Sequence, residues 1–167
     1  YHAAVLGIKD YFRKNNIKKA LLGLSGGIDS ALVVVLAVEA LGKENVIGVL
    51  LPSEYSTSHS ITDAKASAEN LGIEYYTIPI KETFTSALKA LGPIFEGKEP
   101  NVAEENLQSR IRGMILMGIA NKIGAALLNT TNKSELSVGY GTLYGDTNGA
   151  IGALGDIFKT DVWEMSR

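Results

Sequence analysis

The stretch Leu24-Ser25-Gly26-Gly27-Ile28-Asp29-Ser30 decides the fold expected for this 167-residue chain. It follows a short apolar run, Ala20–Leu24, that has the length and composition of a buried strand. It leads into Ser30–Leu41, which is helical in length and composition and is followed by Gly42, a residue type that commonly ends helices. We therefore interpret the stretch as the loop that joins the first strand to its helix.

The residues of this loop suit a polyphosphate. Gly26 and Gly27 let the backbone approach a ligand closely and present N–H groups with no side chain in the way. Ser25 and Ser30 add hydroxyl donors, and the helix that starts at Ser30 favours an anion at its N-terminus. Asp29 would repel a phosphate unless a cation lies between them, and Mg²⁺ is the natural choice. The loop thus predicts a site for a metal and a polyphosphate.

Other interpretations of the loop were weighed. It lacks the Lys of a Walker A loop and the Gly-x-Gly-x-x-Gly spacing of a dinucleotide-binding turn. Gly23–Gly27 does satisfy the Gly-x-Ser-x-Gly pattern of a hydrolase nucleophile elbow, with Ser25 as nucleophile and His59 as the single histidine that follows. A plain turn in which Asp29 caps the helix is a further alternative.

Apolar patterning predicts elements on both sides of the loop. We expect helices at about 2–15, 62–71, 83–91 and 103–123, and strands at 46–51, 74–78 and 125–128. Gly92-Pro93 is expected to end the third of these helices, and a glycine-rich tail follows the last strand. The alternation predicts an α/β fold, a doubly wound parallel sheet with helices on both faces. Ligands of such sheets bind beyond the carboxyl ends of the strands, here Ser25–Ser30, Leu51–His59 and Asn129–Gly155.

Composition excludes several classes of protein. Hydrophobic residues make up 46% and charged residues 20% of the chain, so it can form a core and is not disordered. The net charge of −2 gives no field that would attract nucleic acid or membrane, and no uncharged run exceeds ten residues. There is no cysteine, and His2 and His59 make a poor zinc centre. We expect a soluble, cytoplasmic protein.

A resemblance to a known family rests on five segments. Ser25–Ser30 resembles the Ser-Gly-Gly-x-Asp-Ser pyrophosphate loop of the N-type ATP pyrophosphatases, a superfamily that includes NAD, GMP and asparagine synthetases. Four later segments are similar to motifs of NAD synthetases: Asn106–Arg112, Asn129–Glu135, Gly139–Asp146 and Gly155–Thr160. Pro52–Ser56 and Asn101–Arg112 look closer to glutamine-dependent members than to ammonia-dependent ones. The chain thus resembles the synthetase domain of a glutamine-dependent NAD synthetase.

The resemblance implies an adenine nucleotide alpha hydrolase-like fold and an ATP-dependent carbon–nitrogen ligase. Such enzymes adenylate the nicotinate carboxylate of deamido-NAD with release of pyrophosphate, and ammonia then displaces AMP to give NAD. ATP and Mg²⁺ are the implied cofactors, and deamido-NAD and ammonia are the implied substrates. Two alternatives stay open: another ATP pyrophosphatase, such as a GMP-synthetase-type amidase, and a module that binds adenine nucleotides without turnover.

The resemblance also implies roles for the matching residues. Those implied in binding ATP and pyrophosphate are Ser25, Gly26, Gly27, Asp29, Ser30, Thr130 and Lys159. Asp29 and Glu135 would hold Mg²⁺, and Asp29 and Lys159 would act in catalysis. Arg110, Tyr140 and Asp146 would contact deamido-NAD, although Tyr140 is equally well placed in a core. Exposure to solvent without a role is the alternative for both Arg110 and Arg112, and it is the favoured expectation for Arg112.

Residues 1–167 are expected to form one domain of a longer protein. Tyr1-His2-Ala3 has no initiator Met, and Lys159–Arg167 has the pattern of a helix that continues. Use of glutamine normally takes a nucleophilic Cys, so the resemblance implies an upstream glutaminase domain. It also implies a homodimer or higher homo-oligomer, for which the long helix offers apolar positions: Leu107, Ile111, Met114 and Ile115.

Overall fold

The structure, a computed structural model, describes all residues from Tyr1 to Arg167. Five parallel strands form its sheet: β1 (Lys19–Gly23), β2 (Val46–Leu50), β3 (Glu74–Thr77), β4 (Ala125–Asn129) and β5 (Ile151–Gly152). The helices are α1 (His2–Lys14), α2 (Ile28–Leu41), a 3-10 turn (Lys43–Asn45), α3 (Ser58–Leu71), α4 (Lys81–Phe95), α5 (Val102–Ile123), α6 (Lys133–Val138) and α7 (Lys159–Met165). No helix has the length and apolarity that a membrane span requires.

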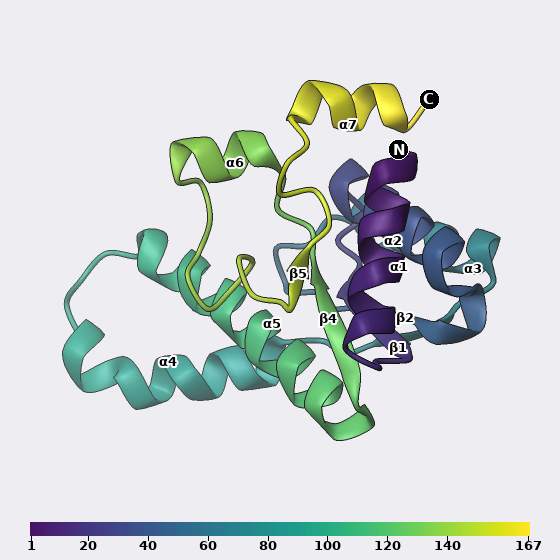
Figure 1. Cartoon of the computed structure of the whole chain (residues 1–167). Helices are drawn as coiled ribbons and strands as arrows, with labels where there is room; N and C mark the ends of the chain where they lie inside the picture. Colours follow the sequence, from purple (N-terminus) through teal and green to yellow (C-terminus); the bar gives the residue numbers. More distant parts are fainter.

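Helices cover both faces of the sheet, as Figure 1 shows. Successive residues of β1 point to opposite faces, so Leu22 packs with α1, α2, α3 and α7 while Leu21 packs with α4 and α5. Both leucines are fully buried. The prediction of a doubly wound parallel α/β sheet is confirmed.

The strand order, β3-β2-β1-β4-β5, places the reversal of the chain in the middle of the sheet. From β1 the chain steps outward to β2 and β3, and it then crosses back along α4 and α5 to β4, on the other side of β1. Ala20 of β1 accordingly pairs with Val46 of β2 and with Ala126 of β4. At such a reversal neighbouring loops diverge and leave a crevice at the carboxyl ends of the strands.

Most of the expected elements are present, with differences that have local causes. The helix expected at 62–71 begins at Ser58, because the hydroxyl of Thr57 accepts a hydrogen bond from the N–H of Ser60 and caps the helix. The expectation that Gly92-Pro93 ends a helix is wrong: α4 continues to Phe95, and the N–H of Glu96 still donates to the carbonyl of Gly92. Pro93 lies in the final turn, where it removes only one donor.

The glycine-rich tail contains two elements that the sequence pattern did not predict, α6 and β5. Both are short, six and two residues, so neither has room for an apolar period. β5 pairs with the end of β4, which brings the tail back to the centre of the sheet. As a result the segment between β4 and α7 folds over the crevice at the carboxyl ends of β1 and β4.

Candidate functional site

The loop after β1 is held in shape by its own serines. The hydroxyl oxygens of Ser25 and Ser30 lie 3.1 Å apart, and the N–H of Gly27 donates to Ser25 Oγ at 3.2 Å. Ser30 Oγ donates to the carbonyl of Gly27 at 3.0 Å and is almost fully buried. The loop is therefore preformed, with Gly27 as the residue before the first turn of α2.

Gly26 is required by a close contact with α3. Its φ of +80° is a conformation that side chains disfavour, and a Cβ at this position would lie 2.2 Å from the carbonyl oxygen of Ser60. No relaxation of a flexible side chain can relieve that overlap, because the obstructing atom belongs to the backbone. The glycine thus lets the loop pack directly on the first turns of α3.

Asp29 is the polar centre of the site. Its Oδ1 accepts a hydrogen bond of 3.0 Å from the amide of Asn132, and its Oδ2 forms an ion pair with Lys159. Lys159 is in turn held by its backbone N–H, which donates to Ser134 Oγ at 3.0 Å. Residues from α2, α6 and α7, far apart in the sequence, meet at this carboxylate.

Glu135 reaches the same cluster through Asn132. The N–H of Asn132 donates to Glu135 Oε2 at 3.0 Å, and Asn132 Oδ1 accepts from the N–H of Glu135 at 3.1 Å, which is a capping box at the start of α6. The side chain of Asn132 is fully buried. One residue therefore fixes both Asp29 and Glu135.

The donor set at this cluster fits a magnesium ion bound together with phosphates. The structure contains no group of three or more His, Cys, Asp or Glu side chains able to hold a metal. Mg²⁺, however, is usually held by one or two carboxylates and completes its shell with water and phosphate oxygens. Asp29 and Glu135 are the two carboxylates of the cluster that could hold such an ion, and Lys159, paired with Asp29, is its one cation.

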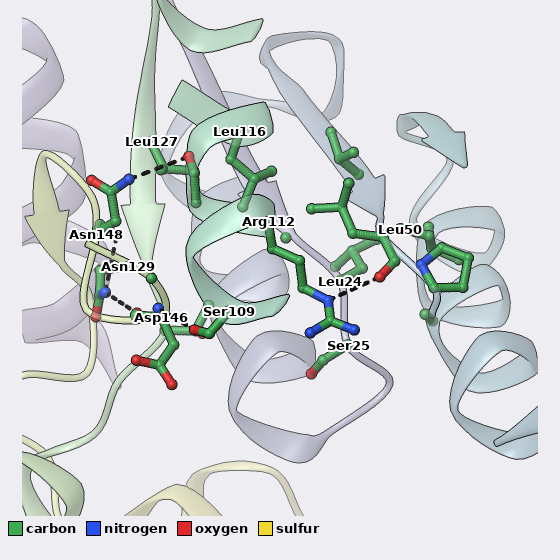
Figure 2. A pocket seen from close by; sticks show the side chains of 18 of the residues that line it. Leu24, Ser25, Leu50, Ser109, Arg112, Leu116, Leu127, Asn129, Asp146 and Asn148 are labelled. Atoms are coloured by element: carbon green, nitrogen blue, oxygen red, sulfur yellow. Dashed lines mark hydrogen bonds between the residues drawn. The ribbon is translucent and has the colours of Figure 1, made fainter. Parts of the chain in front are cut away.

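A cavity of about 350 Å³ lies beside the loop, at the reversal of strand order (Figure 2). Its walls come from the carboxyl ends of β1, β2 and β4, the start of α3, one side of α5 and the segment 145–148. Apolar residues such as Leu24, Leu51 and Ile61 line part of it, and Ser25, Thr130 and Asp146 line it too. The volume lies in the range of pockets for small organic ligands.

The segment before β5 is clamped to α5 and closes one side of the cavity. Asp146 donates its N–H to Ser109 Oγ at 3.0 Å, and its carboxylate accepts from the N–H of Thr142 at 2.5 Å. The amide of Asn129 donates to the carbonyls of Asp146 and Asn148, at 2.6 and 3.0 Å. These bonds hold the exposed Asp146 at the rim of the cavity.

The two arginines of α5 differ in burial, and one of them differs from expectation. The expectation that Arg112 faces solvent is wrong: it is half-buried, lines the cavity, and its Nε donates to the carbonyl of Leu51 at 3.0 Å. Burial lowers the pKa of the Arg112 guanidinium from its ordinary value, although it remains protonated at neutral pH. Arg110 is exposed, lies outside the cavity, and donates from Nε to the carbonyl of Leu143 at 3.2 Å.

Tyr140 is not a core aromatic, because 74% of it is exposed. It lies on the loop that follows α6, and Arg110 contacts the same loop at Leu143. Arg110 and Tyr140 therefore both lie on the outer surface, outside the cavity, whereas Asp146, later in the same loop, lines the cavity itself.

The structure does not assemble a serine-hydrolase site. The hydroxyl of Ser25 is bonded to Ser30 and Gly27, and His59 is an exposed residue in the first turn of α3. A triad needs the imidazole within hydrogen-bond reach of the nucleophile. The Gly-x-Ser-x-Gly pattern is instead part of the preformed loop.

Sequence reasoning missed two residues of the site, Asn132 and Arg112. A signal for Asn132 exists, because Asn followed three residues later by Glu is the pattern of a capping box. No comparable signal distinguishes Arg112 from Arg110 on the same helix.

Comparisons with known proteins agree on one family. A protein-family model described as NAD synthase matches residues 1–167. A protein named glutamine-dependent NAD(+) synthetase, from Synechocystis sp., is 58% identical over 167 residues. That alignment covers 100% of this chain and 30% of the relative, so the chain spans less than a third of that protein's length.

Two solved structures share the fold closely. A glutamine-dependent NAD+ synthetase from Acinetobacter baumannii, in complex with adenosine diphosphate, has a TM-score of 0.96 at 43% identity, and the match covers 97% of this chain and 31% of that one. An NH3-dependent NAD synthetase from Campylobacter jejuni has a TM-score of 0.90 at 32% identity, over 99% of this chain and 69% of that one. The sheet and its surrounding helices are therefore those of solved NAD synthetases.

Proposed function

The chain belongs to the NAD synthase family, and on that premise we propose that it is a synthetase domain that uses ATP to amidate deamido-NAD to NAD. One observation carries the proposal: the preformed loop Ser25–Ser30 and the Asp29 cluster border a ligand-sized cavity at the reversal of strand order. The adenosine diphosphate bound to the Acinetobacter baumannii relative supports a nucleotide as the occupant. Nothing in the comparisons favours a GMP-synthetase-type amidase.

The reaction needs two anions brought together and a leaving group stabilised. An oxygen of the nicotinate carboxylate attacks the α-phosphorus of ATP, the bond from that phosphorus to the bridging oxygen breaks, and pyrophosphate leaves. Ammonia then attacks the carboxyl carbon, loses a proton, and expels AMP. The protein has little covalent work to do in the first step, so positioning and charge stabilisation dominate.

The residues of the loop are suited to hold the leaving pyrophosphate. Ser25 offers an exposed hydroxyl and Gly26 a backbone N–H, Gly27 and the buried Ser30 keep the loop in shape through their own hydrogen bonds, and α2 begins immediately after Gly27. Lys159 adds a positive charge once phosphates draw it from Asp29. Mg²⁺, held by Asp29 and Glu135, would neutralise the pyrophosphate as it leaves. Thr130, at the end of β4, would contact ATP from the opposite wall of the cavity.

The second substrate would bind where the cavity meets the outer surface. Asp146 stands at the rim, and Arg110 and Tyr140 lie beyond it with exposed side chains. A guanidinium suits the phosphates of deamido-NAD and an aromatic ring suits its nicotinate ring. Bound in this way, deamido-NAD would direct its carboxylate into the cavity toward ATP.

The outer surface also supports a proposed homodimer. Of the apolar positions expected to offer a partner face on α5, only Met114 is exposed, because Leu107, Ile111 and Ile115 pack into the core. Large exposed apolar residues gather instead on α6 and the loop after it: Leu136, Val138, Tyr140, Leu143 and Tyr144. A second copy of the chain would cover them and complete the deamido-NAD site.

Sedimentation equilibrium tests the dimer. We expect a dimer at micromolar concentration, and we expect Leu143→Glu to raise the dimer dissociation constant at least about tenfold, because it places a charge in the apolar surface. Leu6→Glu is the matched control, since Leu6 is similarly exposed but lies on α1. A wild-type monomer that still binds deamido-NAD tightly would contradict the proposal.

The proposed reaction is tested by its products. The chain is incubated with Mg-ATP, ammonium chloride and deamido-NAD, and NAD, AMP and pyrophosphate are followed together. We expect the three products in equal amounts. Replacing deamido-NAD with xanthosine monophosphate should give none. AMP formed only with xanthosine monophosphate would support the amidase alternative, and nucleotide binding without any product would support a binding module.

The nitrogen donor gives a further prediction. The Synechocystis relative is named glutamine-dependent, yet these 167 residues contain no cysteine to attack glutamine. We propose that ammonia is the donor this domain uses, and that a glutaminase domain elsewhere in the parent protein releases it from glutamine. With ammonium chloride the chain should form NAD, and with glutamine as the single nitrogen source it should form none. Glutamine-supported synthesis by residues 1–167 would overturn this proposal.

A further inference from the structure

Arg112 is the one cationic side chain among the residues that line the cavity. It projects from α5 toward the carboxyl end of β2, where its Nε donates to the carbonyl of Leu51. Figure 2 shows the guanidinium directed into the cavity that Ser25 also lines. The anchor at Leu51 occupies one of the five N–H donors, so the fork of terminal nitrogens is available to a ligand.

No protein carboxylate forms an ion pair with Arg112, which also borders a second cavity that Glu104 and Glu105 line. None of the six ion pairs of the structure includes it. The single acidic residue of the cavity lining is Asp146, whose carboxylate is bonded to the N–H of Thr142. Half-burying an unpaired cation costs free energy, and an anion that enters the cavity recovers it. The planar fork of a guanidinium matches a phosphate with two parallel hydrogen bonds.

The position of Arg112 indicates which phosphate of a bound nucleotide it contacts. The proposed function, on which this step rests, assigns the leaving pyrophosphate to the loop Ser25–Ser30 and the Asp29 cluster. The apolar wall formed by Leu24, Leu51 and Ile61 suits the base and ribose. Arg112 touches that wall at Leu51 and faces the cavity that Ser25 borders. We infer that Arg112 binds the α-phosphate of the nucleotide, the group that connects the nucleoside to the pyrophosphate.

Binding of three nucleotides that differ only in their phosphates tests the inference. Titration calorimetry on the wild-type chain and on Arg112→Gln compares ATP, AMP and adenosine. We expect Arg112→Gln to weaken ATP and AMP by about 10- to 100-fold and to leave adenosine unchanged, because a charge-assisted pair is lost only where a phosphate is present. Lys122→Gln removes one charge from an exposed position of the same helix and should change none of the three affinities.

A conservative variant separates the phosphate contact from the anchor at Leu51. Arg112→Lys keeps the charge but loses the fork, so AMP should bind with an affinity between those of wild type and Arg112→Gln. Thermal unfolding of each variant checks that it folds. If Arg112→Gln does not fold, the inference is tested with Arg112→Lys, which should bind AMP more weakly than the wild type and adenosine with unchanged affinity.

Several outcomes would overturn the inference. Equal losses for AMP and adenosine would show that Arg112 shapes the nucleoside pocket. A loss for ATP but not for AMP would place it on the pyrophosphate, and unchanged binding of all three nucleotides would show that Arg112 holds no phosphate of ATP. A wild-type chain that binds adenosine, AMP and ATP equally would also contradict it. If the wild-type chain binds none of the three nucleotides, the proposed function itself is contradicted, and not only the role of Arg112.

Discussion

Asp29→Asn is expected to lower ATP-dependent turnover by about 10³-fold or more while leaving the fold in place. The substitution changes almost no volume, and the amide oxygen still accepts one of the two hydrogen bonds that the carboxylate oxygens accept separately, from Asn132 at Oδ1 and from Lys159 at Oδ2. What it removes is the negative charge that lets a metal ion lie among phosphates. Release of pyrophosphate at saturating Mg-ATP and deamido-NAD measures the effect, and circular dichroism verifies the fold.

Substitutions of two other acidic residues show whether the loss of turnover is specific to Asp29. Asp63→Asn removes the same charge from an exposed position on α3 and should leave turnover unchanged. Glu135→Gln should raise the Mg²⁺ concentration needed for half-maximal rate, because one of the two proposed carboxylate ligands is lost. If Asp29→Asn keeps the wild-type rate and Mg²⁺ dependence, Asp29 does not hold the metal.

Asn132→Ala is expected to lower the free energy of unfolding by about 2–3 kcal/mol. The substitution removes the cap of α6 and leaves Asp29 without its amide donor, both at a fully buried position. Urea unfolding followed by circular dichroism gives the difference directly.

Asn132→Ser separates the two contributions of this residue. Serine is as good a helix cap as asparagine but is too short to replace the amide donor at Asp29, so about half of the loss should be recovered. If Asn132→Ser unfolds as easily as Asn132→Ala, the cap contributes nothing measurable and the bond to Asp29 accounts for the whole effect.

The central part of the fold could be predicted from sequence because its signals are local. Short apolar runs such as Ala20–Leu24 mark buried strands, and glycines after Leu41 and Leu71 mark helix ends. The segment from Asn129 to Gly155 could not be predicted in the same way. β5 depends on its pairing with β4, as of Ile151 with Leu128, which no local pattern encodes, and the one local signal for α6 is the capping box of Asn132 and Glu135.

The two arginines of α5 show the limit of sequence reasoning within the site. Arg110 and Arg112 lie one residue to either side of the buried Ile111, so each is about 100° from it around the helix. The apolar periodicity of the helix is therefore the same for both arginines and does not indicate which of them is buried. Only the arrangement of the sheet decides between them, because the carboxyl end of β2 lies on the flank of Arg112.

The central position of β1 also determines when the cavity can form as the chain folds. Ala20 can pair with Val46 as soon as the first two strands exist, but its other neighbour, Ala126, comes much later in the sequence. Contacts between such distant residues form late, because a long loop must close first. During synthesis the loop Ser25–Ser30 is therefore made early, whereas the walls supplied by β4 and by the segment 145–148 are added later. A chain that ends before β4 would therefore have the loop without the complete cavity beside it.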